Sequence, residues 1–384
     1  MKIALLGHGN VGSGVSNIID KGNTQFTKQL EIKKILVKDS SEATDERMVF
    51  NIDDALDDDI DIVVECLGGL EFPFLCISKA LNMKKHVVTS NKKVMATYYD
   101  EIVELAKKNG VNVIFEASVG GGIPVMSNIR HTRRVDEIND FIGIFNGTTN
   151  FILDKMFKEG ESFDSVLVEA QKLGYAESDP SDDIDGHDVK YKCCLTGNMV
   201  WDTSLNLDDI TTFGVRTVNQ RDIYFGKRHQ STLKLVGRGI KKEGHVQVFV
   251  LPEYITNNDT LAHVHSNLNC VEFKSENLGV ASYIGQGAGK FPTAHAVVQD
   301  IVSLLNNEDL EINKDNDVKI NNEEYMSKFY VRTKNLEYFK EYIHKEIDSD
   351  VIITEPMDLF KLKDLIEKTD DKNMFVAGVS LWLR

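Results

Sequence analysis

Residues 2–19, KIALLGHGNVGSGVSNII, contain the pattern that decides the fold of the first part of the chain. A short apolar run leads into a glycine-rich turn, and apolar residues at helical spacing follow it. A strand, a G-x-G-x-x-G turn and a helix in this order are typical of dinucleotide-binding folds, where the helix N-terminus faces the pyrophosphate. A tight turn without a ligand is the alternative. The candidate cofactor contacts of the turn are Gly7, Gly9, Asn10, Val11 and Gly12.

The residues that follow alternate between apolar strands and helices. The sequence predicts strands at 32–37, 60–67, 85–90 and 111–118, and helices at 74–81 and near 95–107. Such alternation indicates an α/β fold with a mostly parallel sheet of the Rossmann type. Because ligands of these sheets bind at the carboxyl edge of the strands, the strand ends supply further candidate cofactor contacts. These are Gly68, Ser90 and Lys92.

Two neighbouring residues of opposite charge follow the second predicted strand, where such folds meet the adenosine ribose. Asp39 could accept a hydrogen bond from the ribose 2′-hydroxyl of NAD. Lys38 could instead pair with the 2′-phosphate of NADP. The sequence therefore leaves NADP and NAD as alternatives.

The composition is that of an ordinary soluble globular protein, with 42% apolar and 27% charged residues. A formal net charge of −16 argues against a nucleic-acid partner, because phosphate contacts need clustered Lys and Arg. No apolar run reaches the length of a membrane span, and the N-terminus lacks the apolar core of a signal peptide. The five cysteines show no paired metal-site spacing, which fits a reducing cytoplasm.

From about residue 130 the pattern changes to that of an α+β domain. Residues 146–150, NGTTN, are typical of a helix cap, and the N–H groups of such a helix start can also receive a carboxylate. The sequence predicts helices from about 151, at 162–173 and at 187–201, and strands at 135–145, 245–252 and 269–275. These strands indicate a second, mainly antiparallel sheet.

Residues 174–192, GYAESDPSDDIDGHDVKYK, place six carboxylates before a lysine. After Gly186 the pattern becomes helical, so Asp188 and Lys192 share one helix face. Such a pair can present a carboxylate and an ammonium to a substrate above the helix. The alternative is an acidic helix start that complements the helix dipole, followed by an ordinary ion pair.

Cys66, at the end of a predicted strand, is a candidate nucleophile. A nucleophilic cysteine would indicate a semialdehyde dehydrogenase that works through a thiohemiacetal. No histidine lies near it in the sequence, so a buried structural cysteine is the favoured interpretation. A second alternative function, which is not enzymatic, is that of a catalytically silent sensor that binds a nucleotide.

The acidic stretch resembles the substrate-binding signature of homoserine dehydrogenases, G-Y-x-E-x-D-P-x-x-D-x-x-G-x-D-x-x-x-K, at every fixed position. Three further segments resemble that family in the same order: GHGNVGSG at 7–14, FNGTTNFIL at 145–153 and GQGAGKFPTAHAV at 285–297. The resemblance covers residues 1 to about 306. It implies an oxidoreductase of threonine and methionine biosynthesis, which interconverts L-aspartate 4-semialdehyde and L-homoserine with NADP or NAD.

The resemblance also implies roles for single side chains. Lys192 would give the proton to the substrate oxygen or polarise the carbonyl, with Asp188 orienting its ammonium. Lys92, in the matching N-K motif, would add positive charge, and Gly289 would lie against the cofactor. The substrate contacts that the resemblance implies are Glu177, Asp183, Asp188, Gly147 and Thr148.

The same resemblance implies a monovalent-cation site, for Na⁺, in the loop after residue 115. Oxygen ligands suit such a hard cation. A glycine-rich turn satisfied by water is the alternative. The implied ligands are one carboxylate and backbone carbonyls, from Glu116, Val119, Gly121 and Ile123.

Residues 326–384 are predicted to alternate strand, helix, strand, helix and strand, with the first helix at 335–347. This order suggests a small ferredoxin-like module and resembles the ACT-type domains of the same family. The first strand lacks a following glycine-rich turn, which argues against an effector site. We therefore expect a dinucleotide-binding domain (1–130 with 290–306), a catalytic and dimerisation domain (131–289), a linker (307–325) and the C-terminal module (326–384), in a homodimer or homotetramer.

Overall fold

The computed structural model describes residues 1–384 except 43, 309–311, 313–315, 317 and 380–384. Part of the predicted linker therefore lies outside the described residues. The chain forms two compact units. The first comprises residues 1–135, 198–204 and 285–317, and the second comprises residues 136–197, 205–284 and 318–384.

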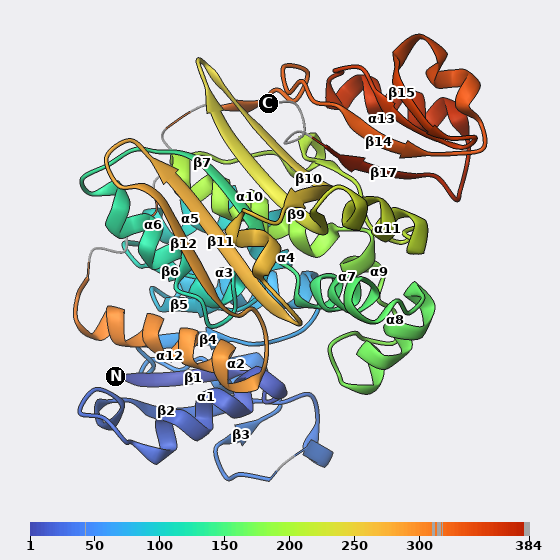
Figure 1. The fold of residues 1–384 in the computed structure, drawn as a ribbon. Helices are drawn as coiled ribbons and strands as arrows, with labels where there is room; N and C mark the ends of the chain where they lie inside the picture. Colours follow the sequence, from blue (N-terminus) through green and yellow to red (C-terminus); the bar gives the residue numbers. More distant parts are fainter. Residues whose placement is uncertain (43, 309–311, 313–315, 317, 380–384) are drawn as a thin grey trace. The chain divides into compact units, whose positions relative to one another are not determined.

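A parallel sheet forms the centre of the first unit (Figure 1). Its described strands are β1 (Lys2–Leu6), β2 (Glu31–Leu36), β3 (Met48–Val49), β4 (Ile62–Glu65), β5 (His86–Thr89) and β6 (Val113–Ile114). They lie in the order β3-β2-β1-β4-β5-β6, and each neighbouring pair is parallel. This is the order of doubly wound dinucleotide-binding folds, in which the ligand lies where the order reverses. The predicted Rossmann-type sheet is confirmed.

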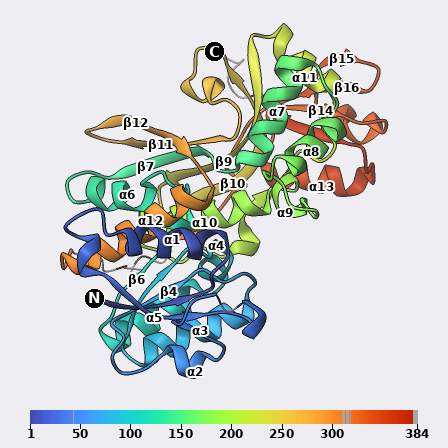
Figure 2. The same ribbon diagram turned by 90° about the horizontal axis from the view of Figure 1, so that it is seen from below.

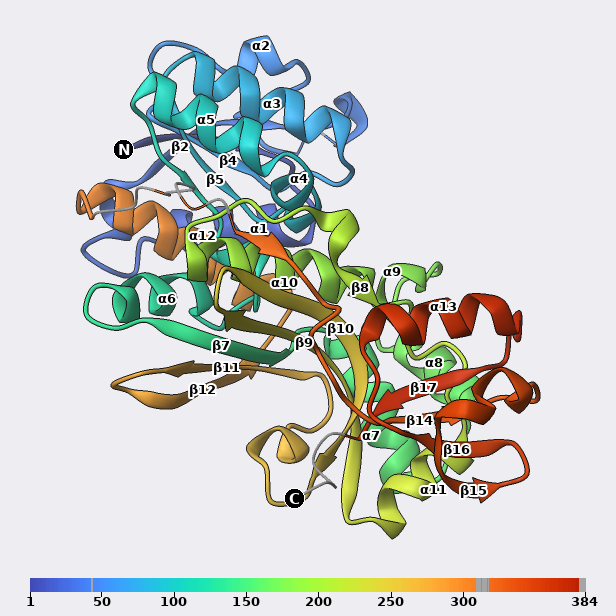
Figure 3. The same cartoon turned by 90° about the horizontal axis from the view of Figure 1, so that it is seen from above.

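Helices cover both faces of this sheet. They include α1 (Asn10–Lys21), α2 (Ile52–Ala55), α3 (Glu71–Asn82), α4 (Lys92–Thr97), α5 (Tyr99–Asn109), α6 (Val125–Arg133) and α12 (Lys290–Leu305). Helices α1 and α12 pack together on one face, and α3 and α5 lie on the other (Figures 2 and 3). Buried aliphatic side chains of β1, β2 and β4 pack against α1 and α12 and form the core.

A mainly antiparallel sheet forms the centre of the second unit. Its main described strands are β7 (Ile138–Ile144), β9 (Ser231–Lys242), β10 (His245–Thr256), β11 (Leu268–Ser275), β12 (Gly279–Gln286), β14 (Phe329–Arg332), β15 (Ile343–Asp348), β16 (Val351–Thr354) and β17 (Phe375–Gly378). They follow the order β12-β11-β7-β9-β10-β17-β14-β16-β15. The short strands β8 (Thr211–Thr212) and β13 (Lys319–Ile320) pair with β10.

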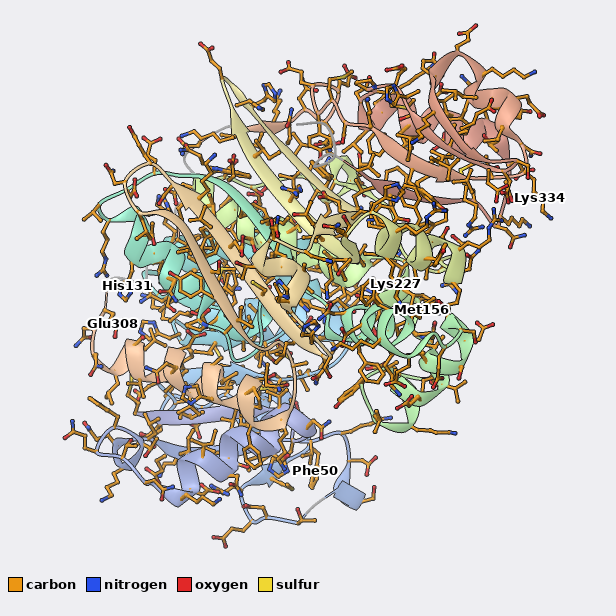
Figure 4. All side chains as sticks on the ribbon, viewed as in Figure 1. Phe50, His131, Met156, Lys227, Glu308 and Lys334 are labelled. Atoms are coloured by element: carbon orange, nitrogen blue, oxygen red, sulfur yellow. The ribbon has the colours of Figure 1, made fainter. Side chains whose placement is uncertain are left out.

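The helices of the second unit include α7 (Gly147–Glu159), α8 (Phe163–Lys172), α9 (Ser181–Ile184), α10 (His187–Trp201), α11 (Gln220–Arg228) and α13 (Leu359–Thr369). As predicted, Asn146 caps α7, where its side chain accepts the Thr149 N–H. Helix α11 packs on α7, and the Lys227 ammonium lies 4.8 Å from the centre of the Phe157 ring. Figure 4 labels Lys227 beside Met156 of α7.

The C-terminal module contains a strand that the sequence did not predict. In place of a helix at 335–347 the chain forms a 3-10 helix, η6 (Leu336–Tyr342), and then β15. Strand β15 pairs with β16 across a two-residue turn. The prediction was wrong because β15 is an edge strand whose side chains are mostly exposed and charged, so it lacks the alternating apolar pattern.

With β15 included, the module has the β-α-β-β-α-β order of a ferredoxin-like unit, with η6 in the place of the first helix. Strands β17, β14, β16 and β15 are neighbours in that order, and each pair is antiparallel. Strand β17 also pairs with β10, where Gly378 lies opposite Glu253 (Figure 1). The end of the predicted last strand, 380–383, lies outside the described residues.

Two predicted elements of the first unit are broken. The strand at 111–118 is shortened to β6 and followed by a 3-10 turn, η3 (Glu116–Ser118). The Glu116 N–H donates to Asp300 of α12 at 2.9 Å instead of continuing a strand ladder. The helix near 95–107 is divided into α4 and α5 at Tyr98.

No described helix combines the length and the apolar character that a membrane span requires.

All five cysteines are free thiols.

Candidate functional site

The glycine turn after β1 leaves space at the start of α1. Gly7 has a φ of 92°, and a Cβ there would lie 2.7 Å from the Cys66 carbonyl oxygen. A Cβ at Gly12 would lie 2.0 Å from the Gly7 oxygen, whereas one at Gly9 would meet no described atom within 4 Å. Gly9 is the N-cap of α1 and makes no side-chain cap, so the first N–H groups of the helix, from Asn10 onward with Val11, can face an anion. The turn therefore fits a dinucleotide pyrophosphate.

Lys38 and Asp39, which follow β2, differ in how they are engaged. The Asp39 carboxylate accepts hydrogen bonds from the Ser41 N–H, at 2.8 Å, and from the Ser41 hydroxyl. These bonds lower the pKa of Asp39 and tie its side chain to its own turn. Lys38 is exposed. The carboxylate thus has a partner within the loop, and the lysine is accessible to a ligand.

Glu65, which is not among the residues predicted from the sequence, joins the ends of β4 and β5. Its carboxylate accepts hydrogen bonds from the Leu67 N–H, at 2.7 Å, and from the Thr89 hydroxyl. Asn91 extends this network, since its N–H donates to Thr89 Oγ1 and its side chain donates to the Leu67 carbonyl. Burial raises the pKa of Glu65 to about 7. In the sequence, Glu65 could have been recognised as a carboxylate at the end of an apolar strand.

This network holds the predicted contacts Gly68, Ser90 and Lys92 at the carboxyl edge of the sheet. Gly68 is exposed in the loop after β4, and the Ser90 N–H donates to the Glu65 carbonyl at 3.2 Å. Lys92 is half-buried and is the first residue of α4. Because β1, β4 and β5 are parallel, these residues share an edge with the glycine turn.

The Cys66 thiol does not have the environment of a nucleophile. Burial, and then the neighbouring Glu65, raise the pKa of Cys66. A thiol with a raised pKa carries little thiolate at neutral pH, and the thiolate is the reactive form. The structure therefore argues against a thiohemiacetal mechanism.

The loop after β6 directs the Glu116 carboxylate to the start of α6. Its two oxygens accept the N–H groups of Met126 and Ser127, each at 2.8 Å. Asp300, which accepts the Glu116 N–H, is also buried. Burial raises the pKa of both carboxyls, and the charge of Glu116 raises that of Asp300 further. The charge of Arg130 acts in the opposite direction and lowers the pKa of both carboxyls.

The other residues implied for a cation site lie in the same loop. Val119 and Ile123 are buried, and Gly121 lies against the backbone of Gly287. Within the described residues no group of three or more His, Cys, Asp or Glu side chains could hold a metal ion. A cation in this loop would therefore depend on one carboxylate and on backbone carbonyls.

Gly289, a predicted cofactor contact, is the N-cap of α12.

In the second unit, Asp188 and Lys192 form a buried ion pair on α10. Lys192 Nζ donates to Asp188 Oδ2 at 2.7 Å, and the two side chains are 9% and 5% exposed for Lys192 and Asp188. Lys192 Nζ also donates to the Phe145 carbonyl at 2.7 Å. The predicted shared helix face is confirmed, and its burial distinguishes this pair from an ordinary surface ion pair.

Asn146 connects this pair to Asp183. Its Nδ2 donates to Asp183 Oδ1 at 2.6 Å and to Asp188 Oδ2 at 2.9 Å, while its Oδ1 accepts the Thr149 N–H. Burial, and then the charge of Asp188, raise the pKa of Asp183. The NGTTN pattern predicts the helix cap at Asn146 but not its contacts with Asp183 and Asp188. These contacts could have been suspected because Asn146 lies in the segment 145–153, FNGTTNFIL, whose resemblance to a known family is given above.

The remaining implied substrate contacts divide into two groups. Gly147 and Thr148 form the start of α7, and Thr148 is buried with its hydroxyl donating to the Tyr175 carbonyl at 2.6 Å. Glu177 is exposed, and its carbonyl accepts a hydrogen bond from Gln171 Nε2. Gly147 and Thr148 therefore form the first turn of α7 after the capping Asn146, whereas the Glu177 side chain lies at the surface.

The cluster of Asp183, Asp188 and Lys192 can carry out acid–base chemistry on an oxygen. A buried ammonium can donate a hydrogen bond or a proton to a developing alkoxide. The adjacent carboxylates can receive a ligand ammonium. These groups suit proton transfer to the oxygen of a small carbonyl compound that carries an amino group.

Two family models match the chain. The model described as "Homoserine dehydrogenase, NAD binding domain" matches residues 7–116, and the model described as "Homoserine dehydrogenase" matches residues 124–302. Homoserine dehydrogenase of Bacillus subtilis is 39% identical over 317 residues, which cover 80% of this chain and 73% of that protein. The Synechocystis enzyme is 38% identical over 79% of this chain and 73% of its own length.

Solved structures agree with these relatives. A homoserine dehydrogenase from Thiobacillus denitrificans superposes with a TM-score of 0.88 at 29% identity, and the match covers 99% of this chain and 98% of that one. A homoserine dehydrogenase from S. aureus superposes with a TM-score of 0.77 at 30% identity and the same coverage.

Proposed function

Because the chain belongs to the homoserine dehydrogenase family of oxidoreductases, we propose that it interconverts L-aspartate 4-semialdehyde and L-homoserine. The observation that carries this proposal is the buried pair of Asp188 and Lys192 beside Asp183, within the segment that resembles the family signature. Purified protein should oxidise NADPH when L-aspartate 4-semialdehyde is added. A protein that neither does this nor reduces NADP with L-homoserine would contradict the proposal.

The proposed mechanism assigns the proton to Lys192. A bound nicotinamide cofactor supplies the hydride for the aldehyde carbon, and the protein must protonate the oxygen. One N–H bond of Lys192 breaks, and an O–H bond forms on the substrate. Asp188 and the Phe145 carbonyl orient the ammonium for this transfer. Lys92, in the nucleotide-binding unit, adds positive charge that stabilises the developing alkoxide.

The amino-acid part of the substrate is proposed to bind the acidic cluster and the start of α7. Its ammonium pairs with Asp183 and Glu177. Its carboxylate accepts hydrogen bonds from Gly147 and Thr148, where helix N–H groups and the dipole favour an anion. The half-buried position of Asp183 beside the buried Asp188 supports this assignment.

We propose that the cofactor is NADP, with Lys38 paired to its 2′-phosphate. Support comes from the neighbouring Asp39, whose carboxylate already accepts two hydrogen bonds from Ser41. The exposed Lys38 then supplies the charge that distinguishes a 2′-phosphate from a 2′-hydroxyl.

We propose that the loop of Glu116, Val119, Gly121 and Ile123 holds a monovalent cation such as Na⁺. The burial of Glu116 beside Asp300 supports this, because a cation would add to the charge of Arg130 in offsetting two buried carboxyls. Sodium chloride should raise the melting temperature above that in choline chloride at equal ionic strength, and Glu116→Gln should remove the difference. Equal melting temperatures of the unaltered protein in both salts would contradict this site.

We propose that the C-terminal ACT-type module has a structural role. After β14 the chain runs directly into Lys334, which Figure 4 labels on this module, and bulky or charged side chains follow it. An effector site needs closer approach to the backbone than such side chains allow.

The chain is proposed to form a homodimer or homotetramer. Strand β12 lies at the end of its sheet, and its side chains Val280 and Ile284 are 63% and 50% exposed. An unpaired edge with exposed apolar side chains is typical of an interaction surface. Light scattering measures the molar mass, and a monomer would contradict this proposal.

A further inference from the structure

A buried lysine of β9 lies against the helix whose start is proposed to receive the substrate carboxylate. Lys234 is 0% exposed, and its Nζ donates to Asn150 Oδ1 of α7 at 2.8 Å and to the Val264 carbonyl at 2.6 Å. Both acceptors are neutral, and Lys234 has no ion-pair partner among the described residues. We propose that the Lys234 ammonium strengthens the binding of that carboxylate through its charge. This inference rests on the proposed function.

The hydrogen bond to Asn150 places this charge beside the first turn of α7. Asn150 is the fourth residue of the helix, which begins at Gly147. Side chains on a helix lean toward its N-terminus, so the Asn150 amide covers the turn that precedes it. The same amide donates to the Leu268 carbonyl at 3.0 Å, and a Cβ at Gly147 would lie 2.7 Å from the Asn267 carbonyl oxygen. The Lys234 ammonium is therefore held next to the helix start, whose first N–H groups have no acceptor within the helix.

The carboxylate that acts on Lys234 lies one turn further along α7. Asp154 is already engaged, because its oxygens lie 2.9 Å from Lys158 Nζ and 2.9 Å from His265 Nδ1, and accept the Ser266 N–H. Burial lowers the pKa of Lys234 to about 8, Asp154 raises this pKa and Lys158 lowers it. The amine is therefore mostly protonated at pH 7. The first turn of α7 itself contains no acidic residue that would offset the Lys234 charge.

A purely structural role would not require a charge at this position. A buried ammonium without an anion is unfavourable, whereas two neutral oxygens can be satisfied by an uncharged donor. A bound carboxylate would give the Lys234 ammonium a nearby opposite charge. Two opposite charges somewhat more than one helical turn apart, at an effective dielectric constant of about 20, attract strongly enough to change affinity about ten-fold.

The test compares L-homoserine with L-homoserine amide, which has nearly the same shape but no carboxylate charge. At pH 7 we expect Lys234→Met to raise KM for L-homoserine about ten-fold and to leave kcat within about two-fold, because the charge acts on binding. The inhibition constant of the amide should stay within about two-fold of that for the unaltered protein. Lys234→Gln keeps an N–H₂ donor without the charge, so it should give the same result, and it decides the question if Lys234→Met does not fold.

Lys85→Met is the matched control, since Lys85 is also buried and donates to a backbone carbonyl, that of Asp58. This control should leave both constants unchanged. An equal rise in both constants in the Lys234 variants, or no rise in either, would overturn the role of Lys234 alone, because a packing defect affects both ligands alike. Absence of turnover with L-homoserine by the unaltered protein would instead overturn the proposed function, and the inference with it.

Discussion

Lys192 shows how a single residue depends on its partners. A buried ammonium is unfavourable unless acceptors surround it. Lys192 donates to Asp188 from the preceding turn of its own helix, and to Phe145 at the end of β7. The first contact follows from helix geometry, and the second follows from how the helix packs on the sheet.

At this scale we expect Lys192→Ala to lower kcat about a hundred-fold or more, because the substrate oxygen loses its proton donor. Fluorescence titration should show unchanged NADPH affinity. Lys190→Ala, on the same helix but outside the buried pair, is the control and should retain turnover. Turnover near the wild-type value in Lys192→Ala would exclude the assigned role.

The proposed preference for NADP over NAD also depends on a single residue, Lys38. We expect Lys38→Ala to weaken NADPH binding by about 1–2 kcal/mol, the strength of one charge-assisted contact, and to leave NADH binding nearly unchanged. Isothermal titration with each cofactor measures the difference. Lys28→Ala removes another exposed lysine of the same unit and serves as the control. Equal loss for both cofactors would show that Lys38 does not contact the 2′-phosphate.

At the scale of elements, Glu65 makes the junction of β4 and β5 sensitive to pH. Its folded-state pKa of about 7 lies above the ordinary value of 4.5. Below both values the carboxyl is protonated in either state. As the pH rises between them, the unfolded chain loses the proton first, so the unfolding free energy falls by roughly 3 kcal/mol.

We therefore expect Glu65→Gln to gain stability relative to the unaltered protein as the pH rises from about 5 to about 7. The glutamine can still accept the Leu67 N–H and can donate to Thr89. Thermal unfolding of both proteins across this range measures the effect. A constant difference in melting temperature would show that Glu65 does not titrate in this window.

A buried ion pair joins α11 to β14. Arg332 Nε lies 2.8 Å from Asp222 Oδ1, and Tyr330 donates to the same oxygen. We expect Arg332→Ala to lower the unfolding free energy by about 3–5 kcal/mol, because Asp222 would remain as a buried charge without its partner.

The adjacent Arg221 provides a matched control, since its pair with Asp350 is 49% exposed at the arginine. Arg221→Ala should cost less than about 1 kcal/mol in urea unfolding. Similar losses in Arg221→Ala and Arg332→Ala would contradict this account.

At the scale of the whole molecule, the C-terminal module and β10 of the second unit form one structure. Strand β17 pairs with β10, and Phe249 and Leu251 of β10 share a hydrophobic core with Phe329 of β14 and Leu362 of α13. Removal of the module would expose this core and an unpaired strand edge. The module is thus part of the fold around the proposed site.

We expect truncation at about residue 320 to lower the melting temperature or change the molar mass, since it exposes the apolar surface of β10. The untruncated chain should show no inhibition by threonine in steady-state assays. Threonine inhibition at physiological concentration that is lost on truncation would overturn the structural role. A truncated protein with unchanged stability and mass would overturn it equally.

Features that depend on local geometry can be predicted from the sequence alone. The glycine turn at Gly7, the cap at Asn146 and the shared helix face of Asp188 and Lys192 follow from turn, cap and helix periodicities. Each involves residues at most a few positions apart. Backbone sterics and hydrogen bonding act the same way wherever such patterns occur.

Contacts between residues that are distant in the sequence depend on the tertiary fold. The Phe145 carbonyl receives Lys192 from 47 residues away and Asn269 from 124 residues away. Edge strand β15 is defined by its pairing with β16, because its exposed charged side chains carry no strand pattern. Such contacts depend on how whole elements pack, and packing is a property of the complete core that no local window of sequence contains.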